Sequence, residues 1–167
     1  GGTDPVSVCL TCPEGYKSDT TFAGCSLCDL GEYGSSPGIC TSCDSTKFEY
    51  QDIKGQTSCK MCQLGYKWTS LKAQCMQCTF GQYGTAAGIC AVSPFGTYQD
   101  EPGKIASKDC PVDTFSDRSG IASKADCTSC AKEKSTGITV GNTNASACLC
   151  RRKNYYQDDK NECIACP

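Results

Sequence analysis

Two stretches decide the fold when they are read side by side. The first is "CTSCDSTKFEYQDIKGQTSCKMC", residues 40–62, and the second is "CAVSPFGTYQDEPGKIASKDC", residues 90–110. Both contain a Tyr-Gln-Asp triplet, at 50–52 and at 98–100, between ends that carry cysteine. The second stretch therefore reads as a copy of the first.

The copy lacks two of the original cysteines. Ser93 stands in place of Cys43, and Ser107 stands in place of Cys59. A cysteine that loses its disulfide partner becomes a free, oxidisable thiol, so bonded cysteines are expected to be lost together. The joint replacement predicts a disulfide between Cys43 and Cys59.

The same rule extends along the chain if the second cysteine of each Cys-x-x-Cys pair bonds the first cysteine of the next pair. It predicts eight disulfides: Cys12–Cys25, Cys28–Cys40, Cys43–Cys59, Cys62–Cys75, Cys78–Cys90, Cys110–Cys127, Cys130–Cys148 and Cys150–Cys163. Cys9 and Cys166 remain, and we expect them to bond cysteines outside this stretch, in the same chain or in a neighbouring subunit. A crossed pairing would leave Cys90 and Cys110 without partners, but sequence alone does not fix connectivity and the alternative stays open.

The composition favours a fold held by disulfides. Of 167 residues, 18 are cysteine, a density that is typical of secreted disulfide scaffolds. Leu, Ile, Val and Phe together make up about 14% of the chain, below the roughly 20% that an ordinary hydrophobic core needs. We therefore expect an extracellular or cell-surface location.

Charge and hydropathy narrow the partners. The net charge is −2 and no long basic run occurs, which argues against nucleic acid. No apolar run approaches the roughly 18 residues of a membrane span, so we expect no span in this segment. The expected partners are proteins, either copies of the chain itself or neighbouring repeats in a longer chain.

The chain repeats internally. Segment 9–40 matches segment 59–90, with every cysteine shifted by 50. The predicted organisation is the tail of a preceding unit (1–8), cysteine-rich repeat 1 (9–58), repeat 2 (59–106), a divergent repeat 3 (107–162) and the start of a further unit (163–167).

Turn-forming residues lie at the start or end of nearly every loop, as in Gly15-Tyr16, Pro37-Gly38 and Gly65-Tyr66. Such residues around four or five extended positions predict short hairpins, and no stretch shows helical periodicity. The predicted fold class is small disulfide-rich repeats that form an elongated rod of short β-hairpins and loops with little or no helix. We expect each loop to contact only its neighbours, and each tyrosine to cover a disulfide as a miniature core.

Two chemical readings of the Cys-x-x-Cys pairs compete with disulfides. Paired Cys-x-x-Cys motifs at this spacing also suit a zinc site, but the chain has no histidine and its cysteines form one continuous string. A thioredoxin-like redox centre needs one such pair at a helix start. Histidine-dependent triads are excluded, and we expect no enzyme activity, no catalytic residue, no metal ligand and no cofactor.

One covalent modification is signalled. Asn144-Ala145-Ser146 matches the Asn-x-Ser acceptor of N-glycosylation. It lies in the polar loop between Cys130 and Cys148, so we expect a glycan at Asn144.

The stretches 40–62 and 94–111 resemble the ephrin-receptor-like cysteine-rich repeat, whose signature combines Cys-x-x-Cys-Pro, Gly-Thr-Tyr, a glycine turn and a further Cys-x-x-Cys. The similarity covers most of residues 9–130 and departs at Ser93 and Ser107. Cysteine-rich arrays of tumour-necrosis-factor receptors, growth-factor receptors and protozoan variant surface proteins are similar as well. The resemblance implies an extended extracellular array and carries over no ligand-binding residue, since such repeats occur in receptors, adhesion proteins and fibre subunits.

Three functions follow as expectations. The first is a structural module, a rod segment of a larger secreted filament, appendage or surface coat. The second is a receptor or adhesion ectodomain that binds a protein ligand. The third is a variable surface antigen of a unicellular organism.

Overall fold

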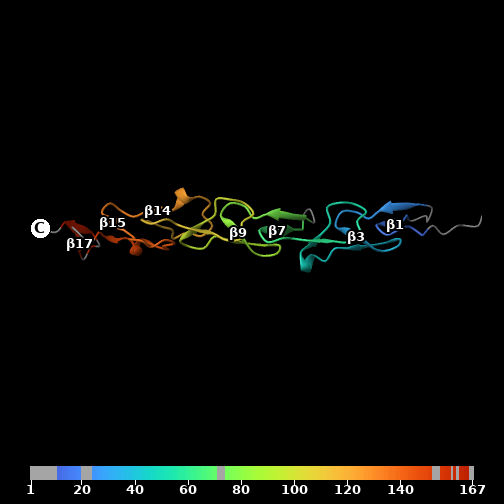
Figure 1. Cartoon of the computed structure of the whole chain (residues 1–167), viewed down its shortest axis with the longest axis horizontal. Coiled ribbons are helices and arrows are strands. Elements are labelled where there is room, and N and C mark those ends of the chain that lie inside the picture. Colours follow the sequence, from blue (N-terminus) through green and yellow to red (C-terminus); the bar gives the residue numbers. More distant parts are fainter. Residues whose placement is uncertain are drawn as a thin grey trace, which may run out of the picture. The chain divides into compact units, whose positions relative to one another are not determined.

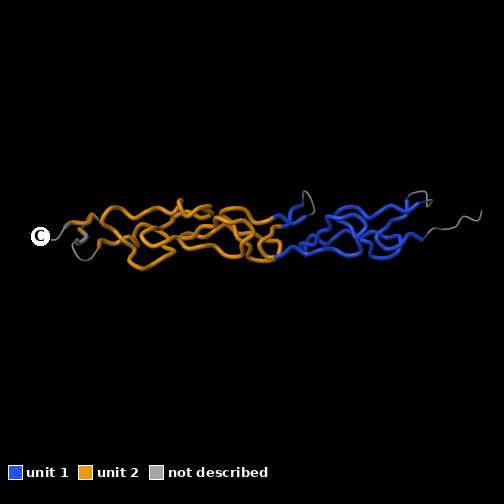
Figure 2. Tube along the Cα trace, turned by 45° about the horizontal axis from the view of Figure 1, so that its top comes forward, with its two compact units in different colours: residues 1–63, 68–76 blue, residues 64–67, 77–167 orange. Residues whose placement is uncertain are grey.

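The computed structural model describes residues 11–19, 24–70, 74–151, 155–158, 160 and 162–165, without the side chains of 155–157 and 165. The chain forms two compact units (Figure 2): unit 1 comprises 1–63 and 68–76, and unit 2 comprises 64–67 and 77–167. This division differs from the three predicted repeats, whose boundaries stay a prediction.

Unit 1 is built from two-stranded antiparallel hairpins. They are β1 (Tyr16–Ser18) with β2 (Cys25–Leu27), β3 (Glu32–Ser36) with β4 (Ile39–Ser42), and β5 (Glu49–Tyr50) with β6 (Lys60–Met61). A single 3-10 turn, η1 (Ser45–Lys47), precedes β5. The hairpin of β7 (Tyr66–Thr69) and β8 (Gln74–Gln77) has residues in both units.

Unit 2 continues the same construction. Its hairpins are β9 (Gln82–Ala86) with β10 (Ile89–Val92), β11 (Thr97–Tyr98) with β12 (Lys108–Asp109), β13 (Thr114–Phe115) with β14 (Thr128–Ser129), β15 (Lys134–Ser135) with β16 (Leu149–Cys150), and β17 (Tyr155–Gln157) with β18 (Cys163–Ala165). Two 3-10 turns, η2 (Lys124–Asp126) and η3 (Ala145–Ala147), come directly before cysteines. Within unit 2 the hairpins that carry β9, β14, β15 and β17 follow one another in chain order (Figure 1).

The predicted class of small disulfide-rich hairpins is confirmed. In the described residues each strand pairs with one partner only, and no α-helix occurs. The elongated rod expected from the sequence concerns the arrangement of the two units and stays a prediction.

Each hairpin closes a loop, and all loops but one are closed by a disulfide. The structure joins Cys12–Cys25, Cys28–Cys40, Cys43–Cys59, Cys62–Cys75, Cys78–Cys90, Cys110–Cys127, Cys130–Cys148 and Cys150–Cys163. These are the same eight pairs that consecutive pairing predicts. Cys9 and Cys166 lie outside the described residues. We name each loop by its limits, so that loop 12–25 is the first, and loop 93–107 is the one without a disulfide.

Each loop from 12–25 to 130–148 has near its start a residue of positive φ, whose carbonyl oxygen accepts a hydrogen bond from the residue that follows the second strand of the hairpin. Gly15 has φ 84° and accepts from the backbone N of Cys28 at 2.8 Å; Gly65 has φ 83° and accepts from Cys78 at 2.8 Å. The positive φ suits glycine, because a Cβ crowds the following carbonyl in this conformation. Three loops use other residues at the equivalent turn: Phe48, Asp113 and Glu133.

Loops contact the next-but-one loop as well as the next, so the expectation of contacts between neighbours alone is wrong. Loop 12–25 reaches loop 43–59 at two glycines: a Cβ added to Gly15 would lie 2.4 Å from the carbonyl oxygen of Gly55. In loop 62–75, a Cβ on Gly65 would lie 2.1 Å from the carbonyl oxygen of Gly103 in loop 93–107. Such approaches require glycine at position 15 and at position 65, because any larger residue would place its Cβ against the backbone of the later loop.

The buried apolar residues are almost all cysteines. Nine buried apolar residues occur in the described part, and all but Ile121 are cysteines. Ile121 packs with Cys110 and Cys127, and the half-buried Tyr98 of the preceding loop lies against this cluster. The expected role of tyrosine as a disulfide cover is met at Tyr98, although the disulfide belongs to the next loop.

Candidate functional site

The cysteines of the described part are committed to structure. All sixteen form disulfides, so they offer no thiolate to a metal or a substrate. Among the same residues, no group of three or more His, Cys, Asp or Glu is placed to hold a metal ion. No helix in the described ranges has the length and apolarity to cross a membrane.

Ser93 occupies the place of Cys43 in the repeat geometry. The backbone N of Cys43 donates to Gly31 at 2.8 Å, and the backbone N of Ser93 donates to Gly81 at 2.8 Å. Ser93 is fully buried, and its hydroxyl donates to the same carbonyl oxygen of Gly81 at 3.1 Å. Ser107 is half-buried. Loop 93–107 thus keeps its hairpin without a covalent link.

The middle residue of the Tyr-Gln-Asp triplet is buried in both described copies that show its side chain. The amide of Gln51 donates to Ser58 O at 2.7 Å and accepts from the backbone N of Ile53 at 3.1 Å. Gln99 donates to Ala106 O and accepts from Glu101 N at 3.0 Å. Each glutamine therefore ties the two sides of its loop together. Sequence reasoning missed this role, although recurrence of the triplet was the available signal.

The aspartate of the triplet forms a repeated ion pair. Asp52 lies 2.6 Å from Lys60, and Asp100 lies 2.6 Å from Lys108. The hydrogen bond from Lys60 lowers the pKa of Asp52, and the bond to Asp100 raises the pKa of Lys108. Each pair joins the second strand of its hairpin to the segment that follows the first strand, at the surface.

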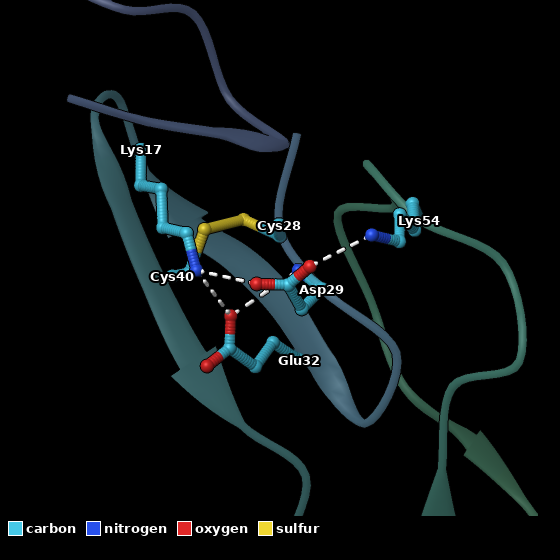
Figure 3. Close-up of polar contacts among 6 residues, drawn as sticks. All are labelled: Lys17, Cys28, Asp29, Glu32, Cys40 and Lys54. Atoms are coloured by element: carbon cyan, nitrogen blue, oxygen red, sulfur yellow. Dashed lines mark hydrogen bonds and ion pairs between the residues drawn. A yellow bond between two sulfur atoms is a disulfide. The ribbon is translucent and has the colours of Figure 1, made fainter. Parts of the chain in front are cut away.

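A cluster of four charged side chains in unit 1 connects three loops (Figure 3). Lys17 of loop 12–25 lies 2.7 Å from Asp29 and 3.4 Å from Glu32 of loop 28–40. Lys54 of loop 43–59 binds the other carboxylate oxygen of Asp29 at 2.9 Å. Glu32 also accepts from the backbone N of Asp29 at 3.2 Å. We call these four residues the ionic cluster.

Asp29 is the centre of the ionic cluster. The hydrogen bond from Lys17, with a second from Lys54, lowers the pKa of Asp29 to about 2. The equivalent positions of the second repeat carry Lys67, Thr79, Gln82 and Pro102, so both carboxylates and one lysine are replaced by uncharged residues. The cluster is therefore not repeated there, and no pattern in one sequence marks it, since its members come from three loops.

Apolar side chains are exposed on both units. In unit 1 they are Leu27, Leu30, Ile39, Ile53, Met61 and Met76. In unit 2 they are Leu64, Phe80, Ile89, Val92, Phe95, Ile105, Val112, Ile138, Val140, Leu149 and Ile164. Ile138 is 94% exposed. Such exposure is common for single residues on a protein surface.

Unit 2 also carries an open groove of about 470 Å³, between loops 110–127 and 130–148. Its charged lining is mixed: Lys132, Lys134 and Arg151 stand beside Asp113 and Glu133. Asp113 already accepts hydrogen bonds from Ser135 Oγ and Thr136 N. The groove thus offers no preference for a ligand of one charge.

Asn144 is exposed, as the predicted acceptor must be. It is the N-cap of η3, and its side-chain oxygen accepts from the backbone N of Ser146 at 3.0 Å.

Comparison with known proteins does not identify a family for the chain. No protein-family model matches the chain, and no curated protein matches it. The ephrin-receptor-like resemblance rests on its motifs alone and stays a prediction.

Proposed function

We propose that the chain is an extracellular structural module, a disulfide-linked repeat segment of a larger secreted filament, appendage or surface coat. One observation carries the proposal. Every described loop except 93–107 is closed by its own disulfide, and the loops also meet through backbone contacts that extend to the next-but-one loop. A fold held together in this way resists mechanical extension and unfolding. The proposal assigns no catalytic activity.

The disulfides support a location outside the cytosol. Sixteen paired cysteines persist only in an oxidising compartment. Without them the chain has little apolar area to bury, because its described core is almost all cysteine. The same bonds would resist proteases, since cleavage requires local unfolding of the backbone.

The exposed apolar residues support assembly with other protein. A module of a filament or coat contacts neighbouring repeats or copies of itself, and such contacts need apolar surface that is covered only in the assembly. The near-neutral net charge of −2 imposes little repulsion between copies.

Electron microscopy of native material labelled with antibody to this chain tests the proposal. We expect label at regular intervals along polymers or across a continuous surface layer. Label confined to isolated molecules that are not part of any ordered array would overturn it.

A receptor or adhesion ectodomain is the second candidate, favoured by the same exposed apolar side chains, Ile138 above all. The full-length reading frame discriminates the two. A membrane span followed by an intracellular signalling domain would favour the receptor, whereas further cysteine-rich repeats and assembly domains would favour the structural module.

A further inference from the structure

Loop 130–148 ends in a 3-10 turn whose cap is an asparagine. The side-chain oxygen of Asn144 accepts from the backbone N of Ser146, and in the preceding loop Ser123 caps η2 by accepting from Ala125 N at 3.1 Å. The two turns stand at the same place, directly before the cysteine that closes the loop. Capping alone therefore does not require asparagine here, since serine serves equally.

What asparagine adds is a carboxamide nitrogen at the surface. The oxygen of Asn144 is held by the backbone N and by the hydroxyl of Ser146. Its nitrogen donates only a long bond of 3.4 Å to Thr143 Oγ1 among the contacts of the described residues. Residues 143–146 are all exposed. The turn thus fixes the oxygen and presents the nitrogen to solvent.

Asn142 shows the contrast within the same loop. Its nitrogen donates to Thr139 O at 3.1 Å, and its oxygen accepts from Thr139 Oγ1 at 3.1 Å. Its side chain is thereby tied to the loop, and the residue two places on is Asn144 rather than Ser or Thr.

We propose that Asn144 is an N-glycosylation site, and the proposal rests on the extracellular part of the proposed function. The donor is a lipid-diphosphate-linked oligosaccharide. The Asn144 nitrogen bonds C1 of the first sugar and loses a proton to a base of the transferase. The bond from C1 to the diphosphate oxygen breaks, and the lipid diphosphate leaves with the electron pair. The product is a β-amide-linked glycan, and no residue is oxidised or reduced.

The loop tolerates this addition. Its tip is held by bonds that do not involve Asn144: Thr136 Oγ1 donates to Thr139 O at 3.0 Å, and Thr139 Oγ1 donates to Thr136 O at 2.8 Å. The glycan would share loop 130–148 with Ile138, which at 94% is the most exposed large apolar residue of the described part, and would add polar bulk to that loop.

Intact mass tests the site. The chain is directed into the secretory pathway of a eukaryotic cell by an added leader and is weighed before and after peptide N-glycosidase. We expect a glycan-sized loss of mass on enzyme treatment, with conversion of Asn144 to Asp in the released peptide. Asn144→Asp should abolish the loss yet keep the cap, because a carboxylate accepts from Ser146 N equally well.

Two further variants separate the acceptor from the cap. Ser146→Ala keeps Asn144 and its backbone hydrogen bond but removes the hydroxyl, and it should abolish the glycan. Ser146→Thr should retain it, and Asn142→Gln, the matched control, should leave it unchanged.

The failures are distinguishable. A secreted protein with all eight disulfides whose mass does not change on treatment with the peptide N-glycosidase would overturn the glycan alone. A secreted protein with free thiols among the sixteen cysteines that are paired in the structure would overturn the extracellular function as well, as would a chain that is retained and reduced.

Discussion

The hydroxyl of the fully buried Ser93 donates a 3.1 Å hydrogen bond to the carbonyl oxygen of Gly81. In the first repeat the equivalent position is Cys43, bonded to Cys59 with their Cα atoms 5.8 Å apart. The serine thus preserves the packing of the lost cysteine and replaces a covalent link by a hydrogen bond. Loop 93–107 is accordingly the one loop whose closure can be restored by substitution.

The double variant Ser93→Cys/Ser107→Cys should form a ninth disulfide. Closing a loop of ~15 residues removes unfolded-state entropy worth roughly 3 kcal/mol, so the free energy of unfolding should rise by up to that amount. Non-reducing peptide mapping and chemical denaturation measure the two effects. Each single variant should instead carry a free thiol and lose stability, and two free thiols in the double variant would show that the copies differ in geometry.

Gln51→Leu should destabilise unit 1. The change removes the side-chain hydrogen bonds to Ser58 O and from Ile53 N, and a typical intramolecular hydrogen bond contributes about 0.5–1.5 kcal/mol to the free energy of unfolding. Denaturant unfolding measures the loss. Gln56→Leu is the matched control, because the side chain of Gln56 is exposed and its backbone bond to Gly34 remains; equal losses in both variants would contradict the role given to Gln51.

Gly65→Ala should be far more damaging than Gly137→Ala. Both glycines have positive φ, 83° and 68°, so both variants carry a conformational penalty of about 1–2 kcal/mol. Only at Gly65 would the new Cβ lie 2.1 Å from the carbonyl oxygen of Gly103, whereas nothing lies within 4 Å at Gly137. Thermal unfolding under oxidising conditions compares them, and similar midpoints would argue against contact between next-but-one loops.

The ionic cluster should stabilise unit 1 in a pH-dependent way. The pKa of Asp29 is lowered from 3.8 to about 2 by its bonds to Lys17 and Lys54. Its contribution is therefore fully present above the ordinary pKa and is lost as the pH falls through about 2. The substitution Asp29→Asn should reduce the loss of stability in this pH range, which denaturant midpoints measure. Salt of about 1 M should reduce the difference in stability between Asp29→Asn and the unaltered chain. If Asp29→Asn leaves the pH profile of stability unchanged, the ionic cluster does not stabilise unit 1.

A reductant should unfold the protein, whereas a chelator should have no effect. Reduction removes the bonds that hold nearly the whole described core, so circular dichroism should report loss of the fold. A divalent-metal chelator under oxidising conditions should leave the spectrum unchanged, because the described cysteines are paired with one another. Unfolding by the chelator would revive the zinc interpretation.

The disulfide pairing was accessible from the sequence because the two altered positions, Ser93 and Ser107, are the two ends of one bond. The hairpins were accessible because glycine turns recur at fixed distances from cysteine. Phe48, Asp113 and Glu133 take the same positive-φ turn. Of these residue types only aspartate adopts positive φ more readily than most, so the turns at Phe48 and Glu133 could not be predicted from residue preference.

The contacts between next-but-one loops were not accessible, since a nearest-neighbour picture explains the same spacing. The importance of Gln51 could be predicted from the sequence only in part. Recurrence of the triplet marked the position, but burial of a polar amide depends on carbonyl groups of the loop that only the structure places. The ionic cluster was invisible because Lys17, Asp29 and Lys54 come together only after three loops have formed.

The approach of Gly15 to Gly55 and of Gly65 to Gly103 has a genetic corollary. Gly81 meets Gly120 and Gly96 meets Gly141 in the same way, so the contact recurs at successive loops. Removal or insertion of a single loop would therefore give each flanking loop a new next-but-one partner. The close approach would survive wherever the earlier loop of the new pair opens at a glycine, because the added Cβ would otherwise meet the backbone of the later loop.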